Sequence, residues 1–518
     1  MTITTAKRPA GALLLTPLAL AALLWSAECR ADWKFTPTVG VTETYTDNPS
    51  LQRDELAHGQ FVSEAMGGFA LTGQGSRLRV NAAARVHQFA YTDGSQPNLN
   101  DREHDYSASV LAKLADDLFL DTSASGGPQS VSAFGPQVSD NLYSMGNRTT
   151  VNTWRISPYV QHRYGSVVDM LLRYSRDGVD AGARNPFGSS TASTGSLNLT
   201  SGTAFHTVGW GFSYTHQEMD NRLGGPSTSE NAVADLRWRL SPQISATAST
   251  GYDSYDYQTL GGRTAGRNWS AGFIWSPSAR TSLQASFGRH YFGKTGSLVA
   301  QHRSRQSVWS INYSDAITTS RQQFLLPSTI DTASLLDSLF SASIPDPVLR
   351  QQAVQLYLQS TGLPTSLANN VNYLSNRYLR QKQLQAAVAF NWAHSSLVTT
   401  ANRTEREALS LRQSDSELLG SQLSTLNDNV RQYGLNSVFS YRLTSRTIAT
   451  ATANIDRSTS LDTGVKQTHR QLRVGLTRRI ERRLNVAVDM RHSEGRTDVL
   501  SGGKYSENAI TASLSAQF

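Results

Sequence analysis

Segments in which apolar and polar side chains alternate recur along almost the whole of this 518-residue chain. In one of them the apolar residues are Leu78, Val80, Ala82, Ala84 and Val86, and the residues between them include Arg79, Asn81 and Arg85. The last segment, Ile510–Phe518, has the same pattern and ends on an aromatic residue. A period of two places the two sets on opposite faces of a β-strand. The sequence therefore predicts an all-β chain whose strands each have one apolar and one polar face.

Such strands can build either a series of soluble β-sandwiches or one transmembrane β-barrel, which turns its apolar face to lipid and its polar face to the lumen. The barrel is favoured because short and long connections tend to alternate, and because no linker or change of composition divides residues 32–518. Charged residues make up only 17% of the chain, against about 25% in soluble domains. Aromatic residues also gather near predicted strand ends, as interfacial girdles require: Trp33, Tyr91, Tyr106, Tyr252, Tyr255, Tyr291, Tyr313, Trp392 and Tyr441.

The connections give the strand number. Ten short turns join twenty strands, and the first and last strands bring the total to about 22, within a range of about 18–24. The short turns are expected at 73–76, 115–117, 164–166, 202–204, 241–243, 276–280, 314–315, 393–395, 444–446 and 481–483. Two less regular parts are included: Gly293–Arg303 as a long loop and Ile317–Leu325 as a strand. We expect a single antiparallel barrel whose first and last strands pair.

The longest insert, residues 326–377, is not strand-like. Asp346 and Pro347 are suited to the N-cap and first position of a helix, and Gly362-Leu363-Pro364 would end it. The sequence predicts a partly helical insert, which could cap the outer mouth, fold into the lumen or form an ordinary surface loop.

The N-terminus predicts secretion. Lys7 and Arg8 precede an apolar run over Gly11–Trp25, and small residues precede a cleavage site after Ala31. Residues 1–31 are therefore expected to be a signal peptide, and cleavage would remove Cys29, the single cysteine of the chain. The mature chain would then contain no disulfide, thiol nucleophile or thiolate metal site.

Alternation also predicts which charges face the lumen. The basic residues assigned to that face are Arg79, Arg85, Lys113, Arg155, Arg163, Arg173, Arg237, Arg239, Arg473, Arg479 and Arg491, whereas the acids found there are Asp121, Asp169, Asp235 and Asp489. This excess of positive charge would favour anions in a pore. Arg479 stands at a strand end, where lipopolysaccharide phosphate or bulk solvent are alternative surroundings.

No catalytic motif stands out. The chain contains no Gly-x-Ser-x-Gly or His-Glu-x-x-His sequence, and its histidines lie on different predicted strands. We therefore expect no enzyme, no cofactor and no metal site. Scattered basic residues also argue against nucleic acid as a partner.

A set of short motifs follows the strands in order. They are Thr42-Glu43-Thr44-Tyr45-Thr46-Asp47-Asn48, Ser157-Pro158-Tyr159, Gly209-Trp210-Gly211, Trp275-Ser276-Pro277-Ser278-Ala279-Arg280-Thr281-Ser282-Leu283, Phe292-Gly293 and Tyr505-Ser506-Glu507-Asn508 with the terminal Phe518. Through these motifs the mature chain resembles a family of outer-membrane barrel proteins encoded with the PEP-CTERM/exosortase sorting system, often beside exopolysaccharide biosynthesis genes.

The resemblance implies a location in the Gram-negative outer membrane and a pore or export function in that system. The alternatives are a non-conducting structural or assembly component and, with less support, an outer-membrane enzyme. The expected partners are outer-membrane lipid, lipopolysaccharide, the barrel-insertion machinery and either polysaccharide or periplasmic export proteins. As in similar barrels, the C-terminal strand with Tyr505 and Phe518 is expected to be the insertion signal.

Overall fold

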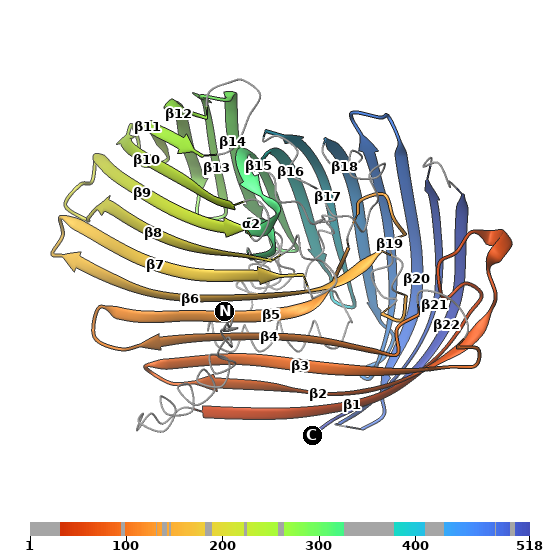
Figure 1. Ribbon diagram of the computed structural model, residues 1–518. Coiled ribbons are helices and arrows are strands. Elements are labelled where there is room, and N and C mark those ends of the chain that lie inside the picture. Colours follow the sequence, from red (N-terminus) through yellow and green to blue (C-terminus); the bar gives the residue numbers. More distant parts are fainter. Residues whose placement is uncertain are drawn as a thin grey trace, which may run out of the picture.

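The structure is a computed structural model of the chain, and Figure 1 shows its strands arranged around a wide interior. It describes residues 32–94, 99–130, 132–136, 142–144, 147–181, 189–221, 225–256, 264–325, 378–409, 429–481, 483–497 and 503–518. The predicted signal peptide (1–31) and the predicted helical insert (326–377) lie outside these ranges.

The described residues form 22 strands and two short helices. The strands are β1 (Asp32–Thr46), β2 (Gln60–Gln74), β3 (Leu78–Tyr91), β4 (Arg102–Lys113), β5 (Leu118–Ser130), β6 (Arg148–Tyr164), β7 (Val168–Asp180), β8 (Ser190–Ser201), β9 (Val208–Asn221), β10 (Gly225–Arg239), β11 (Ile244–Tyr255), β12 (Ala265–Ser278), β13 (Thr281–His290), β14 (Gly293–Arg303), β15 (Ser307–Thr319), β16 (Tyr378–Asn391), β17 (Ser395–Ala408), β18 (Val430–Arg442), β19 (Thr447–Ser460), β20 (Lys466–Arg479), β21 (Leu484–Thr497) and β22 (Lys504–Gln517). The helices are η1 (Asp54–Leu56) and α2 (Ser320–Leu325).

The sheet closes on itself. Each strand pairs antiparallel with its neighbours in the chain, and β1 pairs with β22 from Thr38↔Gln517 to Thr46↔Ala509. The backbone N–H of Phe518 donates to Pro37 O at 3.0 Å, so β22 ends beside the start of β1. Closure satisfies the backbone groups that an open sheet edge would expose to lipid. The predicted all-β closed antiparallel barrel of 22 strands is confirmed.

Two errors in the predicted strand boundaries offset one another. Gly293–Arg303, expected as a loop, is strand β14, and the predicted turn at Ser314–Asp315 lies inside β15. The real short turn is at 304–306, where Ser304 N donates to Ser307 O. Ile317–Leu325 was predicted to be a strand, but β15 ends at Thr319 and α2 follows. The strand total was therefore right although these local assignments were wrong.

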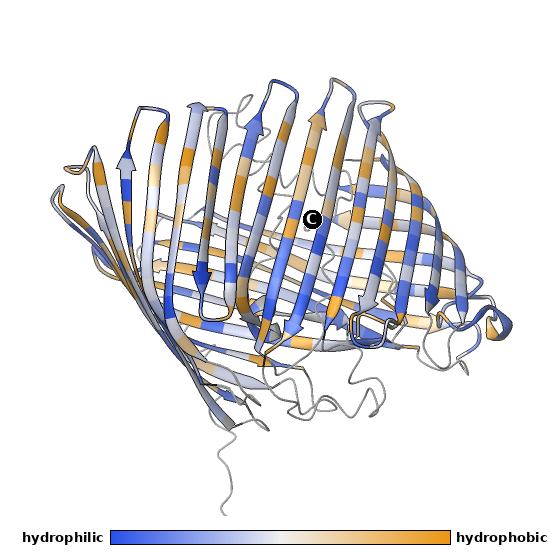
Figure 2. Ribbon diagram, turned by 90° about the horizontal axis from the view of Figure 1, so that it is seen from above, coloured by the Kyte–Doolittle hydropathy of each residue, from blue (hydrophilic) through white to orange (hydrophobic). Residues whose placement is uncertain are grey.

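Exposed apolar side chains form a belt on one face of the sheet, and the colours along single strands alternate accordingly (Figure 2). Near the short turns the belt contains Trp33, Tyr164, Trp238, Trp275, Trp392 and Tyr441, and near the long connections it contains Tyr45, Phe61, Tyr252, Trp269, Phe287 and Tyr433. A closed barrel with two aromatic girdles is typical of the outer membrane, which is where we place the chain. None of the described helices is both long and apolar enough to span a bilayer.

Two aromatic residues predicted for the girdles lie instead on the opposite, lumen-facing side. Tyr91 pairs with buried Val62 and packs beside Tyr143, and Tyr255 packs against Met219 and Tyr378. They are near strand ends, as predicted, but segments inside the barrel supply their apolar contacts.

The β1–β22 seam carries the first of the motifs. The Asp47 carboxylate accepts hydrogen bonds from Asn508 N and Nδ2, each at 2.7 Å. Asn48 is buried, accepts from Gln52 N and donates to Gln52 O and Ser506 O. These bonds tie the β1–β2 connection to β22, so the motif has a structural function at the point of closure.

The two predicted insertion-signal residues occupy different environments. Phe518 is 58% exposed at the end of the chain. Tyr505 is buried on the lumen face, and its hydroxyl lies 3.2 Å from His469 Nδ1. Its ring covers the paired Gly495, where an added Cβ would come within 2.0 Å of it. An aromatic ring that covers a glycine on the neighbouring strand is a known stabilising pair in β-sheets.

We expect changes at Phe518 and Tyr505 to have different effects, the first on outer-membrane levels and the second on stability. Deletion of Phe518 should lower the amount of barrel in the outer membrane and lower its unfolding free energy by no more than about 1 kcal/mol, for the one backbone hydrogen bond to Pro37. Tyr505→Ala should lower that free energy by about 3 kcal/mol, because it removes a buried aromatic ring. Outer-membrane levels and urea unfolding of the purified barrel measure the two effects. Normal membrane levels after deletion of Phe518 would contradict its signal function.

Candidate functional site: the lumen and its lid

The lumen differs between its two ends. Near the short turns, inward residues such as Arg79, Asn81 and Gln284 are exposed. Near the long connections, inward residues such as Thr46, Val430 and Glu507 have no exposed surface. In bacterial barrels the short turns are periplasmic. The periplasmic half is therefore open to water, and the outer half is filled.

One structure that fills the outer half is made by the ends of β15 and β16 together with α2. We call these residues, 315–325 and 378–380, the lid. Ile317 and Tyr378 pack against Ala192 and Met219 of the β8–β9 wall. The Tyr378 hydroxyl lies 3.2 Å from Ser227 Oγ on β10, although β16 pairs only with β15 and β17. The lid thus leaves its own wall and reaches another part of the barrel, and Figure 1 shows α2 inside the ring of strands.

An ion pair fixes the far end of the lid. Arg321 on α2 donates to the carboxylate of Asp177 on β7, and also to Asp177 O at 3.0 Å. Both side chains are almost fully buried, at 6% and 4% exposure. Burial lowers the pKa of the Arg321 guanidinium, and the Asp177 carboxylate acts in the opposite direction. Leu325 adds a contact with Val151 and Val179.

The Arg321–Asp177 ion pair, which we call the latch, leaves some hydrogen-bond donors of Arg321 without a partner among the described residues. Within the described part of the chain, Arg321 Nε and Nη1 are buried without a hydrogen-bond partner. Arg155 pairs with Asp177 in the β6–β7 register and adds a second positive charge nearby. A buried polar nitrogen without a partner costs about 1–3 kcal/mol. The lid is therefore held by an interaction that is weaker than its burial suggests.

A second inward contact comes from the β5–β6 connection. The Tyr143 hydroxyl donates to Glu507 Oε1 at 3.2 Å and accepts from Arg491 Nη2 at 3.1 Å. Its ring packs on Val62 and Phe89 of β2 and β3. Burial and the Glu507 carboxylate raise the pKa of Tyr143 well above its ordinary value, so the hydroxyl remains a donor. This contact joins the loop to both sides of the seam.

The register places the predicted basic residues on the face opposite the apolar belt, but most are paired. The pairs are Arg85–Asp105 at 2.9 Å, Lys113–Asp116 at 3.4 Å, Arg163–Asp169 at 2.5 Å, Arg173–Asp121 at 3.2 Å, Arg473–Asp489 at 2.9 Å and Arg491–Glu507 at 2.8 Å. Arg173 also lies 4.3 Å above the Tyr159 ring. These side chains are not free to attract a permeant anion.

The remaining predicted arginines are mostly near the short turns. Arg79, Arg237 and Arg239 are exposed on the inner face and form no ion pair with another described residue. Arg479, for which bulk solvent and lipopolysaccharide were also considered, is exposed at the end of β20 and pairs in register with Asn485. The unpaired positive charge is thus concentrated at the periplasmic mouth.

Sequence reasoning missed several acids on the inner face. Besides Asp121, Asp169, Asp235 and Asp489, the register adds Glu64, Glu103, Asp105, Asp177, Asp253, Asp456 and Glu507. The register also adds Lys34, Arg406 and Arg442 to the basic residues of this face, so the excess of basic over acidic residues is smaller than predicted. Most of the missed acids lie towards the outer strand ends, beyond the clearest alternation.

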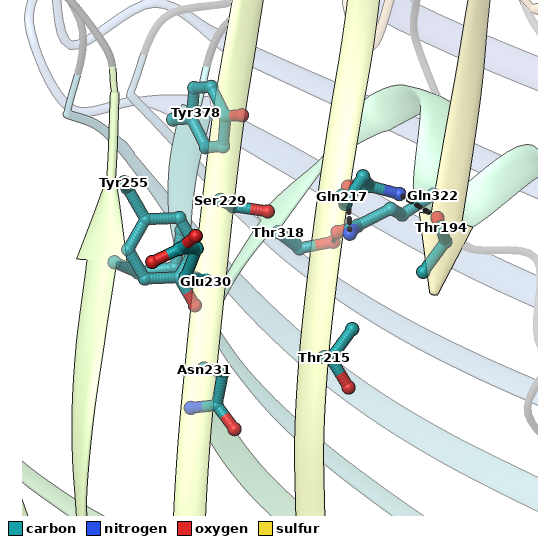
Figure 3. Close-up of a pocket in the computed structure, with 11 residues that line it drawn as sticks. Thr194, Thr215, Gln217, Ser229, Glu230, Asn231, Tyr255, Thr318, Gln322 and Tyr378 are labelled. Carbon is teal, nitrogen blue, oxygen red and sulfur yellow. Dashed lines mark hydrogen bonds between the residues drawn. The ribbon is translucent and has the colours of Figure 1, made fainter. Parts of the chain in front are cut away.

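A cavity of about 270 Å³ lies between the lid and the β8–β11 wall (Figure 3). The lid supplies Ile317, Thr318, Gln322 and Tyr378, and the wall supplies Thr194, Thr215, Gln217, Ser229, Glu230, Asn231 and Tyr255. Gln217 Nε2 donates to Thr194 Oγ1 at 3.0 Å, and Gln322 Nε2 donates to Gln217 Oε1 at 3.5 Å. Polar side chains of the lid and the wall thus meet in this cavity.

The described residues offer little for catalysis. No group of three or more His, Cys, Asp or Glu side chains among them could hold a metal ion. His87 lies between Glu64 and Asp105, at 2.6 and 3.3 Å, and His290 is 2.5 Å from Asp253. In neither place does a serine or threonine hydroxyl bond to the histidine. These histidines serve as cross-strand ion-pair partners.

Comparisons with known proteins show the fold. No family model and no curated protein matches the chain. The barrel is similar to the FrpB iron transporter from Neisseria meningitidis, with a TM-score of 0.50, 10% identity, and coverage of 93% of this chain and 81% of that one. The siderophore receptor PirA from Pseudomonas aeruginosa gives a TM-score of 0.44 at 10% identity, with coverage of 94% of this chain and 80% of that one. The ferric enterobactin receptor PfeA from the same organism gives a TM-score of 0.45 at 11% identity, with coverage of 94% of this chain and 81% of that one. At such identities FrpB supports the barrel architecture alone.

Proposed function

We propose that the protein is a gated outer-membrane conduit that serves as a pore or export component of an exopolysaccharide or PEP-CTERM sorting system. The observation that carries the proposal is the asymmetry of the lumen. Its periplasmic half exposes polar inward side chains, and its outer half is closed by a lid held through Arg321 and Asp177. A barrel that is open to water in its periplasmic half and closed by a lid in its outer half is suited to the regulated passage of a solute.

The charges indicate the class of solute. The paired lumen side chains nearly balance one another, while Arg79, Arg237 and Arg239 stand unpaired among the described residues of the periplasmic mouth. Positive charge at a low-dielectric entrance concentrates anions. A polar polymer with some negative charge, such as an acidic polysaccharide, fits this arrangement. Its entry from the periplasm corresponds to export.

The competing proposal is a non-conducting structural or assembly component, and the filled outer half supports it. The two differ in one observable, which is ion current. A refolded mature chain in a planar bilayer should conduct if the lid moves, whereas a purely structural barrel should remain silent.

Selectivity tests the charges at the mouth. We expect Arg79→Glu/Arg237→Glu/Arg239→Glu to shift the reversal potential in a salt gradient towards cations, because lumen positions tolerate polar change and the entrance field would invert. The matched control, Arg85→Asp/Asp105→Arg with Arg473→Asp/Asp489→Arg, exchanges the charges of two lumen pairs and leaves the net charge of the lumen unchanged. It should mainly lower thermal stability. Selectivity that remains anionic in a folded mouth variant would contradict the proposed entrance.

A further inference from the structure

We propose that the cavity beneath the lid is a binding site for one neutral sugar residue, an inference that names the ligand class of the proposed conduit and rests on it. The cavity joins Thr318, Gln322 and Tyr378 of the lid to Thr215, Gln217 and Tyr255 of the wall (Figure 3). Its volume of about 270 Å³ suits a single ring rather than a large chelate. Pockets for drug-sized ligands start at about 300 Å³.

The side chains match the chemistry of a sugar. Gln217 and Gln322 are amides that can both donate and accept, and the hydroxyls of Thr215 and Thr318 can do the same. A sugar hydroxyl has the same dual capacity, so each can be paired in either direction. The Tyr255 and Tyr378 rings meet edge to face with centroids 5.9 Å apart, and they supply an apolar surface for the C–H groups of a ring.

The charge of the cavity excludes other ligands. Among the described residues, no lysine or arginine lines it, and the one acid in the lining, Glu230, lies 3.0 Å from His216 Nδ1. The two arginines of the lid are bound elsewhere, Arg321 to Asp177 and Arg380 to Asp315. A phosphate, a sulfate or an anionic iron chelate would find no positive partner in this lining, and a metal ion would find no carboxylate cluster. A neutral polyhydroxyl compound is the class that remains.

The position of the cavity gives the ligand a regulatory effect. A bound ring contacts the lid and the wall together, and those contacts exist only while the lid is closed. A ligand stabilises the state to which it binds more tightly. Occupancy by a sugar should therefore hold the lid shut, and release of the sugar should favour opening.

Saturation-transfer NMR on the detergent-solubilised full chain tests binding directly. The probes are the methyl glycosides of glucose, galactose, mannose and N-acetylglucosamine, with inorganic phosphate as the anionic comparison, followed by ³¹P line broadening. We expect at least one glycoside to bind and phosphate not to bind. Thr215→Val and Gln217→Leu should each weaken binding about fivefold, which corresponds to the loss of one neutral hydrogen bond.

Matched controls lie on the same inner face outside the cavity. Thr247→Val and Gln284→Leu should leave binding unchanged. Absence of binding for every glycoside, equal binding by the cavity variants and wild type, or tighter binding of phosphate would overturn the sugar site. None of these results depends on current through a bilayer, so a silent barrel that binds a glycoside would contradict only the conduit.

Discussion

Gram-negative cells that carry the Arg321→Ala variant in their outer membrane should become several-fold more sensitive to vancomycin, a glycopeptide too large for ordinary diffusion pores. The substitution removes the only side-chain ion pair that the structure shows between α2 and the described wall. Detachment of the lid would join the open periplasmic half of the lumen to the outside. The measurement is the minimal inhibitory concentration at equal outer-membrane levels of the protein.

The control separates loss of the latch from general damage. Arg305→Ala changes an exposed arginine in the 304–306 turn, far from the lid along β15, and should leave sensitivity unchanged. Both variants should retain heat-modifiable migration, which reports a folded barrel. If Arg321→Ala is folded and abundant yet leaves the cells as resistant as wild type, the latch does not close the pore.

The largest loss of stability is expected from Arg491→Leu. Glu507 is fully buried beside the seam. Its carboxylate accepts hydrogen bonds from Arg491 Nη2 at 2.8 Å, from the Thr46 hydroxyl at 2.9 Å and from the Tyr143 hydroxyl at 3.2 Å. Without Arg491 its carboxylate would be a buried charge without a cation. Breaking such a pair costs about 3–5 kcal/mol. Urea unfolding of the barrel in detergent, followed by tryptophan fluorescence, measures the change.

Two comparisons make the result specific. Arg85→Leu breaks a pair whose arginine is 57% exposed, and it should cost less than about 1 kcal/mol. The double variant Arg491→Met/Glu507→Leu removes both buried charges and should recover much of the loss. An Arg491→Leu barrel as stable as the Arg85→Leu barrel would show that Glu507 is not held as the structure indicates.

The strand faces could be predicted because a period of two is a local property of the sequence. β14 was missed for the same reason: Leu298, Val299 and Ala300 are three consecutive apolar residues, and they break the alternation. Ile317–Leu325 has six consecutive polar residues between Ile317 and Phe324, so the alternation of a strand is absent there. β15 accordingly ends at Thr319 and α2 follows.

The lid and its cavity could not be read from the sequence. Arg321 and Asp177 are 144 positions apart, and they meet only because barrel closure sets the distance between β15 and β7. The same holds for Tyr143 and Glu507, at a separation of 364. The lumen charges were predicted in part, since the faces of the arginines follow from alternation but their partners lie on neighbouring strands.

Single-channel current of wild type and Arg321→Ala, recorded side by side in planar bilayers, tests the gated conduit most directly. The account predicts a small wild-type conductance with brief transitions to a larger level, and a variant that stays at this larger level. Addition of a bound glycoside should make the wild-type transitions rarer. Silence in both proteins, or identical conductance without transitions, would contradict a lumen closed by a movable lid.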